Sequence, residues 1–288
     1  MSNDSLRFVS AASVSLEEYA DALTAAFRGY QFPMVLDVAL LARKVRLEQH
    51  DLQHSLVAYE GDRVAGAAAL AVRADAGWVG GFGIVPEQRG RGRGRELMSA
   101  LLEQARACKL RRLSLEVLAQ NAAARRLYEG AGMHVVRDLL ILERAADSGA
   151  GAGTVAGGDS LKVEEADSLK EAAPSELLTH FARLHAEPPA WQRGLPSLLV
   201  GNLRGLYLSE RERPRAYALL GRAQDGNTYV SDLAAASAVD AAALCASLKG
   251  VAGALKIVNE PEHSLFTAPL LANGFVETER QHEMQMSL

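Results

Sequence analysis

The sequence predicts a mixed α/β fold that occurs twice in tandem. Three observations support this prediction. Helix-period and strand-period hydrophobic patterns alternate along 288 residues, a length that suits two domains of ordinary size. A segment rich in glycine and alanine separates two halves of similar length. The second half repeats the order of elements that closes the first half, which indicates a diverged internal duplication.

The first half begins with two helices and a strand meander. Ser15 is a candidate N-cap for a helix over Leu16–Phe27, and the helical pattern resumes over Val35–Leu47 after Pro33. Strands follow at Ser55–Tyr59, Val64–Val72 and Trp78–Val85, and the tight turn at residues 60–63 makes the first two a hairpin. Glycines inside the third strand predict a bulge or the close approach of a ligand or backbone.

The first half closes as a βαβ unit followed by a further helix and strand. Leu97, Leu101 and Ala105 recur at helical spacing, so a helix follows the glycine-rich run after the third strand. A strand over Leu113–Leu118, a helix over Ala122–Glu129 and strand residues over Met133–Leu142 complete the order. The second half repeats it with strands at Arg215–Leu220 and Thr228–Leu233, a helix, a strand, a short helix and a final strand. We therefore predict domains at 1–145 and 161–288, joined by a flexible linker at 146–160.

Composition excludes several classes of protein. Hydrophobic residues make up 49% and charged residues 23%, which is globular composition. Two cysteines are too few for a disulfide scaffold, and no apolar run approaches the ~20 residues of a membrane span. Residues 1–10 do not resemble a signal peptide, so we expect a cytoplasmic protein with no membrane partner.

Charge is distributed unevenly between the halves. The net charge of −4 gives no global field that favours nucleic acid, so no nucleic-acid partner is expected. Up to Arg144 there are 19 basic and 17 acidic residues, which leaves 12 basic and 18 acidic residues for the remainder. A polyanionic ligand is therefore expected to bind the first half.

The segment from Pro86 to Gly94 carries the strongest chemical signal. It joins a strand to an amphipathic helix, and its glycines let main-chain N–H groups approach an anion without obstruction. The helix dipole and alternating arginines add positive charge at the same place, so the implied ligand is a pyrophosphate. A P-loop is excluded because Arg95 and Glu96 follow Gly94, and a dinucleotide fingerprint fails because its third glycine site is Arg95. A solvated glycine turn and an RNA-binding Arg-Gly segment remain as alternatives.

A second motif lies downstream, and the two together resemble the GNAT superfamily of N-acetyltransferases. The pattern [Q/R]-x-x-G-x-[G/A] is met by Arg89, Gly92 and Gly94. The pattern N-x-x-A-x-x-L-Y-x-x-x-G-[F/M] is met by the residues Asn121, Ala124, Leu127, Tyr128, Gly132 and Met133. The resemblance covers residues 6–144 well and 161–288 weakly. It implies a GNAT-like central mixed sheet flanked by helices, duplicated in tandem.

The resemblance also implies a cosubstrate, acetyl-CoA, and roles for individual residues. The cosubstrate would lie between the strands Trp78–Val85 and Leu113–Leu118. Ile84 and Val85 would pair with the pantetheine arm by main chain, and an N–H near Ile84 would polarise the thioester carbonyl. Tyr128 would protonate the departing thiolate, and Asn121 would contact the pantetheine arm or position the catalytic end. The pyrophosphate would be bound by amides of the cradle residues Arg89, Gly90, Arg91, Gly92, Arg93 and Gly94.

Other interpretations of these residues stay open. Asn121 is equally suited to cap the helix that follows it, and Tyr128 could be a packed aromatic residue. No general base is evident: Glu87 and Glu116 are the nearest carboxylates, and both are more typical of structural or solvated positions. Cys108 follows Leu101 and Ala105 at buried spacing, so we expect it in the core. The seven histidines show no metal-ligand spacing, and no metal is predicted.

The second half lacks both motifs. Residues 234–240 follow its third strand with no Gly-x-Gly pattern and no arginine, and the helix before Gly274 has no tyrosine at the corresponding position. We therefore predict a degenerate domain without a CoA cradle, which supports the active half, walls the substrate site or forms an oligomer interface. The predicted activity is acetyl transfer to a primary amine of a small molecule, by direct attack in a ternary complex. A non-catalytic acyl-CoA sensor is the alternative, and a homo-oligomer is compatible with either.

Overall fold

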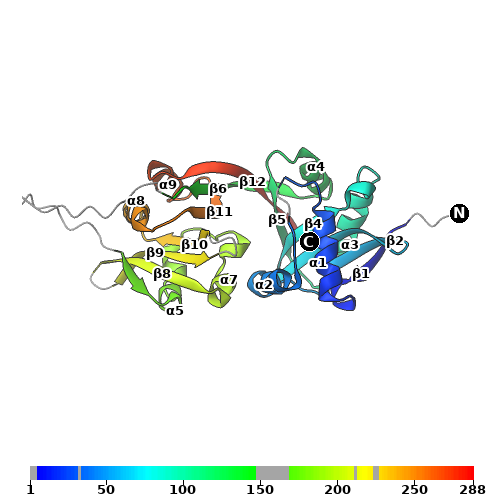
Figure 1. The fold of residues 1–288 in the computed structure, drawn as a ribbon, viewed down its shortest axis with the longest axis horizontal. Helices are drawn as coiled ribbons and strands as arrows, with labels where there is room; N and C mark the ends of the chain where they lie inside the picture. The colour runs from blue at the N-terminus through cyan, green and yellow to red at the C-terminus, as the bar shows by residue number, and fades with distance from the viewer. Residues whose placement is uncertain (1–4, 32–33, 147–168, 211–212, 223–226) are drawn as a thin grey trace, which may run out of the picture. The chain divides into compact units, whose positions relative to one another are not determined.

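The computed structural model describes residues 5–31, 34–146, 169–210, 213–222 and 227–288. The chain forms two compact units (Figure 1). Unit 1 comprises Met1–Arg137 and His282–Leu288, and unit 2 comprises Asp138–Gln281. The predicted linker at 146–160 lies outside the described residues, apart from Ala146.

The sheet of unit 1 begins with four antiparallel strands. Their order is β1 (Arg7–Ser10), β2 (Leu56–Glu60), β3 (Arg63–Arg73) and β4 (Ala76–Ile84). Next to β4 lies β5 (Arg112–Leu118), which runs parallel to it, and beyond β5 lies the end of β12 (Val276–Ser287). The parallel pair is the point at which the meander enters the predicted βαβ unit.

Helices cover both faces of this sheet. The small side chains of β3 alternate, so that Ala67 and Ala69 pack with α1 (Leu16–Ala26) and α2 (Val38–Glu48). Ala68 and Leu70 face α3 (Arg93–Ala107), and the same cluster includes residues of α4 (Ala122–Gly130). Ser15 caps α1 as predicted, since its hydroxyl accepts a hydrogen bond from Glu18 N at 3.0 Å.

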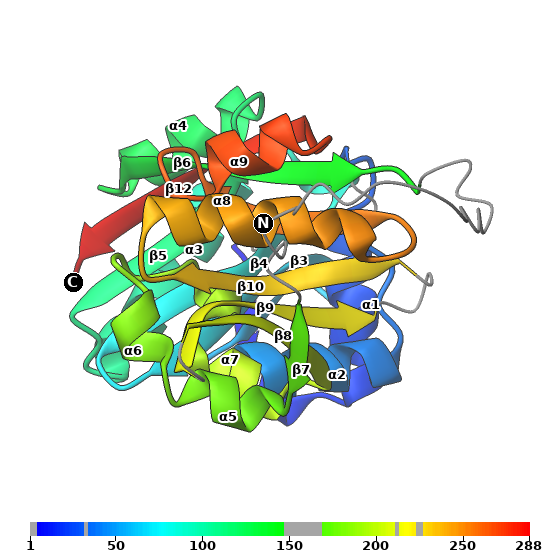
Figure 2. The same cartoon turned by 90° about the vertical axis from the view of Figure 1, so that its left-hand side faces the viewer.

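Unit 2 repeats this layered arrangement. Its strand order is β6 (His134–Arg144), β11 (Leu255–Pro261), β10 (Thr228–Ala235), β9 (Arg213–Arg222), β8 (Leu203–Glu210) and β7 (Lys170–Ala172). Helices α8 (Ala238–Ser247) and α9 (Thr267–Ala272) pack on one face of the sheet. The other face packs against α5 (Pro174–Leu178), α6 (Phe181–Leu184) and α7 (Leu195–Val200), as Figure 2 shows. The mixed α/β architecture and its duplication are as predicted.

Two long strands pass from one unit into the other. Strand β6 starts in unit 1, and its residues Leu140 and Leu142 are buried in the core of unit 2. Strand β12 starts in unit 2, and its residues Met284 and Met286 are buried in the core of unit 1. These units differ from the predicted domains 1–145 and 161–288, because a boundary placed at a glycine-rich segment does not reveal an exchange of strand ends.

Most regular elements match the predicted ranges within a few residues, and the exceptions are short except for β8, which has eight residues. The sequence pattern missed β1, β7 and β8, together with α5, α6 and α7. Strands of four and three residues, and helices of five and four, are too short for a hydrophobic period to be recognised. Within the described ranges, no helix has the length and apolarity required to cross a bilayer.

Candidate functional site

The candidate site of unit 1 starts where β4 and β5 separate. The two strands pair at three positions, which end at Trp78 and Ser114. Strand β4 continues to Ile84 and β5 to Leu118, and no pairing between them is found over these later residues. The facing edges of both strands beyond Trp78 and Ser114 are therefore available for main-chain hydrogen bonds with another molecule.

A bulge in β4 marks the start of this separation. The register against β3 shifts between Ala69 and Leu70, which leaves Gly80 as the extra residue and confirms the predicted bulge. A Cβ atom at Gly80 would lie 2.3 Å from the Trp78 ring and 2.5 Å from His50 Nε2. Only glycine therefore fits between these two rings. His50 is itself buried, and its Nε2 lies 2.9 Å from Glu48 Oε2.

Beyond the bulge, successive amides of β4 point to opposite sides. Val85 N donates to Ala65 O of the neighbouring strand at 2.9 Å, and its carbonyl accepts from Gln88 N at 3.0 Å. By strand alternation, the amides of Phe82 and Ile84 point toward the side of β5. Of the predicted pair Ile84 and Val85, only Ile84 directs its N–H toward the side of β5, since Val85 N donates to β3. Strand alternation also places the N–H of Phe82 on this side, and the sequence prediction did not include Phe82.

The predicted cradle forms the start of α3. Gly90 and Gly92 have φ angles of 78° and 81°, in the left-handed region that favours glycine. Gly92 is the N-cap residue and supplies no side-chain hydrogen bond, so the first-turn amides of the helix are not satisfied by a side-chain cap. Arg91 and Arg95 are exposed beside them. An anion placed here would meet a helix N-terminus and two guanidinium groups.

The other two arginines of this run are held by the protein itself. Arg89 donates through Nε to Ile84 O at 2.9 Å and through Nη2 to Arg28 O at 2.7 Å, which links the end of β4 to the segment after α1. Arg93 is buried and pairs with Glu60 at 2.5 Å and with Glu96 at 3.1 Å. Hydrogen bonds from Gln88 and Arg93 lower the pKa of Glu60. The side chains of Arg89 and Arg93 therefore position the loop, and any role in binding falls to their main chain.

Helix α4 carries the second motif. Asn121 is its N-cap, and its side-chain oxygen accepts from Ala124 N at 3.1 Å, so it has the capping role that the sequence left open. Tyr128 is 7% exposed, and its ring meets that of Phe82 edge-on at a centroid distance of 5.9 Å. Burial, followed by the neighbouring Tyr30, raises the pKa of Tyr128, so its hydroxyl stays protonated at neutral pH.

The two candidate carboxylates are in different surroundings. Glu87 is exposed and forms a surface ion pair with Arg28 at 3.2 Å. Glu116 lies in β5 beyond the last pair with β4, and its Oε2 accepts a hydrogen bond from Trp78 Nε1 at 2.7 Å. Glu116 therefore lies in the separated part of the strands, whereas Glu87 does not. The sequence did not distinguish the two, because the separation of β4 from β5 is a tertiary property.

The first half of the chain matches the model of a known enzyme family. Residues 16–133 match the Acetyltransferase (GNAT) family. A segment of 51 residues is 43% identical to YycN of Bacillus subtilis (strain 168), described as an uncharacterised N-acetyltransferase. That segment is 18% of this chain and 33% of the relative, so the match spans a third of the relative's length.

Solved structures share the fold of the whole chain. A GCN5-related N-acetyltransferase from Sphaerobacter thermophilus has a TM-score of 0.70 at 16% identity, covering 98% of this chain and 95% of its own. A tandem GNAT protein from the clavulanic acid biosynthesis pathway has a TM-score of 0.68 at 16% identity, covering 98% of each chain. A putative acetyltransferase from Pyrococcus horikoshii has a TM-score of 0.64 at 16% identity, covering 99% of this chain and 89% of its own. The chain thus has a tandem GNAT fold.

Proposed function

We propose that unit 1 is an N-acetyltransferase that moves the acetyl group of acetyl-CoA to a primary amine by direct attack in a ternary complex. The proposal rests on two groups of main-chain N–H donors that occur together and that lack a side-chain cap or a strand partner. One set is the uncapped start of α3, with its two left-handed glycines, which suits a pyrophosphate. The other is the edge of β4 at Phe82 and Ile84, which suits an amide-bearing arm added as a strand.

The chain's own residues supply the remaining chemistry. The N–H of Ile84 or Phe82 would stabilise negative charge that develops on the thioester oxygen. As the amine nitrogen forms its bond to the acetyl carbon, the carbon–sulfur bond breaks and Tyr128 gives its proton to the sulfur. The amine must lose a proton as well, since its pKa is about 10. Glu116 is the carboxylate that we assign to accept it.

The assignment of Glu116 rests on its position. It is on the separated part of β5, on the same side as Trp78, to which it is hydrogen-bonded. Trp78 also borders His50, which pairs with Glu48. Glu48 is already paired with Lys44 at 2.7 Å, so the feature that favours a cationic amine as acceptor is the Glu116 carboxylate beside the Trp78 ring. A small-molecule amine is the acceptor that we propose.

The start of α8 in unit 2 corresponds to the start of α3 but has a side-chain cap, which supports a degenerate second domain. Helix α8 begins after β10, as α3 begins after β4, but Ser237 caps it by accepting from Asp240 N at 3.2 Å. The carboxylate of Asp240 lies in the first helical turn and is paired with Arg215, so a carboxylate of the protein itself already lies at this helix start and holds the nearby cation. The described residues of this segment also lack a left-handed glycine.

The strands of unit 2 also separate, but a buried side chain bridges them. Strands β10 and β11 pair at Thr228 and Tyr229, and the register of β10 then shifts, as that of β4 does. Arg193 pairs with Asp232 of β10 at 3.6 Å and with Glu260 of β11. Although burial opposes the charge, Glu260 and Asp232 raise the pKa of Arg193. An internal ion-pair network thus links the strands that a pantetheine arm would have to join.

Two measurements test the proposal. Calorimetric titration of the full chain with CoA should give one site per chain, and Arg91→Ala should weaken it while Arg213→Ala, a basic residue of unit 2, should not. Thiol release from acetyl-CoA should then depend on an added amine. Absence of CoA binding would refute the proposal. Binding without thiol release across a broad amine panel would favour the acyl-CoA sensor instead.

A further inference from the structure

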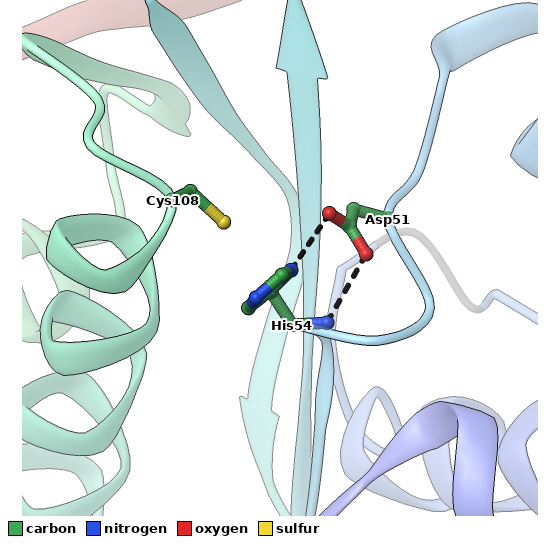
Figure 3. Close-up of side chains that lie close together, drawn as sticks. All are labelled: Asp51, His54 and Cys108. Carbon is green, nitrogen blue, oxygen red and sulfur yellow. Dashed lines mark hydrogen bonds and ion pairs between the residues drawn. The ribbon is translucent and has the colours of Figure 1, made fainter.

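Three side chains with metal-binding atoms converge at the opposite end of α3 from the cradle. Asp51 and His54 belong to the turn between α2 and β2, and Cys108 is the C-cap residue of α3. One donor atom from each lies within 4.8 Å of the other two. Figure 3 shows the Cys108 thiol pointing from the helix end toward the carboxylate and the imidazole. Helix α3 has 15 residues, which places this cluster about 22 Å from the helix start.

The turn that carries Asp51 and His54 is fixed by its own hydrogen bonds. Asp51 N donates to Leu70 O at 2.7 Å, and Asp51 O accepts from Ser55 N at 2.8 Å. The side-chain Oδ1 of Asp51 accepts from the amides of Gln53 and His54. Its other oxygen, Oδ2, is 2.8 Å from His54 Nδ1. The carboxylate and imidazole are thus oriented before any ligand arrives.

The third side chain lies at the edge of the core. Cys108 packs against the core cluster of unit 1, where the sequence placed it, but it is only partly buried, and its thiol faces the Asp51 side chain. It also lies where α3 ends, so the negative end of the helix dipole adds to the charge of Asp51. A cation would be stabilised at this point, whereas an anion would not.

We propose that Asp51, His54 and Cys108 form a site for a divalent transition-metal ion of the zinc class. Oxygen, imidazole nitrogen and thiolate sulfur are the donor types that zinc accepts, and three protein ligands would leave a fourth position for water. With the imidazole proton on Nε2, the ionised carboxylate and thiolate balance the two positive charges of the ion. Ligand atoms in a tetrahedral zinc site are about 3.3–3.6 Å apart. Asp51 Oδ2 and His54 Nδ1, now 2.8 Å apart, would therefore separate by roughly 0.5 Å, while the Cys108 sulfur, within 4.8 Å of both side chains, would move closer.

A nucleophilic triad is the competing interpretation of the same residues. It requires a thiolate at rest, stabilised by positive charge. The Asp51 carboxylate and the carboxyl end of α3 instead place negative charge beside Cys108. The local charge therefore favours a bound cation over a free nucleophile. This inference departs from the sequence prediction of no metal, because that prediction considered the spacing of histidines along the chain and not their approach to Asp51 and Cys108.

Cobalt is the probe for the test, because a cobalt–thiolate bond gives a near-ultraviolet charge-transfer band. Titration of the reduced full-length protein with Co²⁺ should give this band at one ion per chain, and zinc should abolish it by displacement. Cys108→Ser should remove the band and Asp51→Asn should weaken it. Two variants are matched controls and should retain it: Cys245→Ala, at a cysteine buried in unit 2, and His263→Gln, at an exposed histidine.

A second readout needs no variant. Stoichiometric zinc should slow alkylation of Cys108 by iodoacetamide about tenfold, since the metal-bound thiolate is protected. Mass spectrometry of the peptide that contains Cys108 measures this. The proposal is overturned if no thiolate band forms, if the band survives Cys108→Ser, or if zinc leaves the alkylation rate unchanged. None of these results depends on acetyl transfer.

Discussion

Trp78 donates its indole N–H to Glu116 at 2.7 Å, across the two strands of unit 1 that stop pairing at Trp78 itself. This single contact fixes the carboxylate at the place where main-chain contacts between the strands have ended. It also orients Glu116 away from the core face of β5, on which Leu113 and Leu115 are buried. The contact is the reason to prefer Glu116 over Glu87 as the base.

We expect Glu116→Gln to lower kcat about 100-fold, a typical share for a positioned acid–base group. Glutamine retains an oxygen that accepts the Trp78 N–H, so the fold and the affinity for CoA should be preserved. Initial rates at saturating acetyl-CoA measure the effect. Glu87→Gln is the matched control and should retain activity, because Glu87 is on the surface. Equal rates for both variants and the wild type would exclude Glu116 as the base.

Tyr128→Phe should also slow turnover about 100-fold, because the variant keeps the ring packed on Phe82 but loses the proton donor. The dissociation constant of CoA should change by less than about twofold, since the role assigned to the hydroxyl is proton transfer. Tyr207→Phe in unit 2 is the control. A large loss of CoA affinity in Tyr128→Phe would contradict the assigned role.

Gly92→Ala should weaken CoA binding. A Cβ at Gly92 meets nothing within 4 Å, so the direct cost is the strain of alanine at a φ of 81°, about 1–2 kcal/mol. Gly253→Ala offers the same strain in unit 2, at a φ of 87° and in equally open space. Thermal unfolding should show similar losses of stability for both, while calorimetry should show reduced CoA affinity for Gly92→Ala alone.

Arg193→Met should destabilise the protein by about 3–5 kcal/mol, because Asp232 and Glu260 would then be buried without their cation. Urea unfolding measures this free energy. The further changes Asp232→Asn and Glu260→Gln should recover part of the loss, since they remove the uncompensated charges. Arg204→Ala breaks an exposed pair with Glu171 and should cost less than about 1 kcal/mol.

Stability should fall at alkaline pH because of buried tyrosines. Burial raises the pKa of Tyr19 and of Tyr128 above the ordinary value of 10, so both stay protonated in the folded protein when an unfolded chain would release their protons. The unfolded state then binds fewer protons, and each residue lowers the free energy of unfolding by about 1.4 kcal/mol per pH unit above pH 10. Denaturant unfolding at pH 9 to 11, with phenolate absorbance, checks this. Stability that is constant over that range would contradict it.

The sequence predicted much of the fold, including the glycine-rich start of α3. The strand–glycine–helix order around Gly92 and the cap of α4 at Asn121 are local properties, and local patterns reveal them. The same patterns could not show that Arg89 and Arg93 turn back onto the protein, since their partners Ile84, Arg28 and Glu60 depend on tertiary structure. Local patterns also could not show that Arg193 pairs with both Asp232 and Glu260, because these residues are far apart in the chain.

The path of β12 has a consequence for how this protein is made. Met284 and Met286 are part of the core around α3, and Leu288 N bonds to Arg111 O at 3.1 Å. A ribosome that has translated all of residues 1–137 has therefore not yet produced the strand that finishes the first unit. That unit can complete its core only after residues 282–288 have emerged, so the nascent amino-terminal half must wait, or be chaperoned, until that strand has been synthesised.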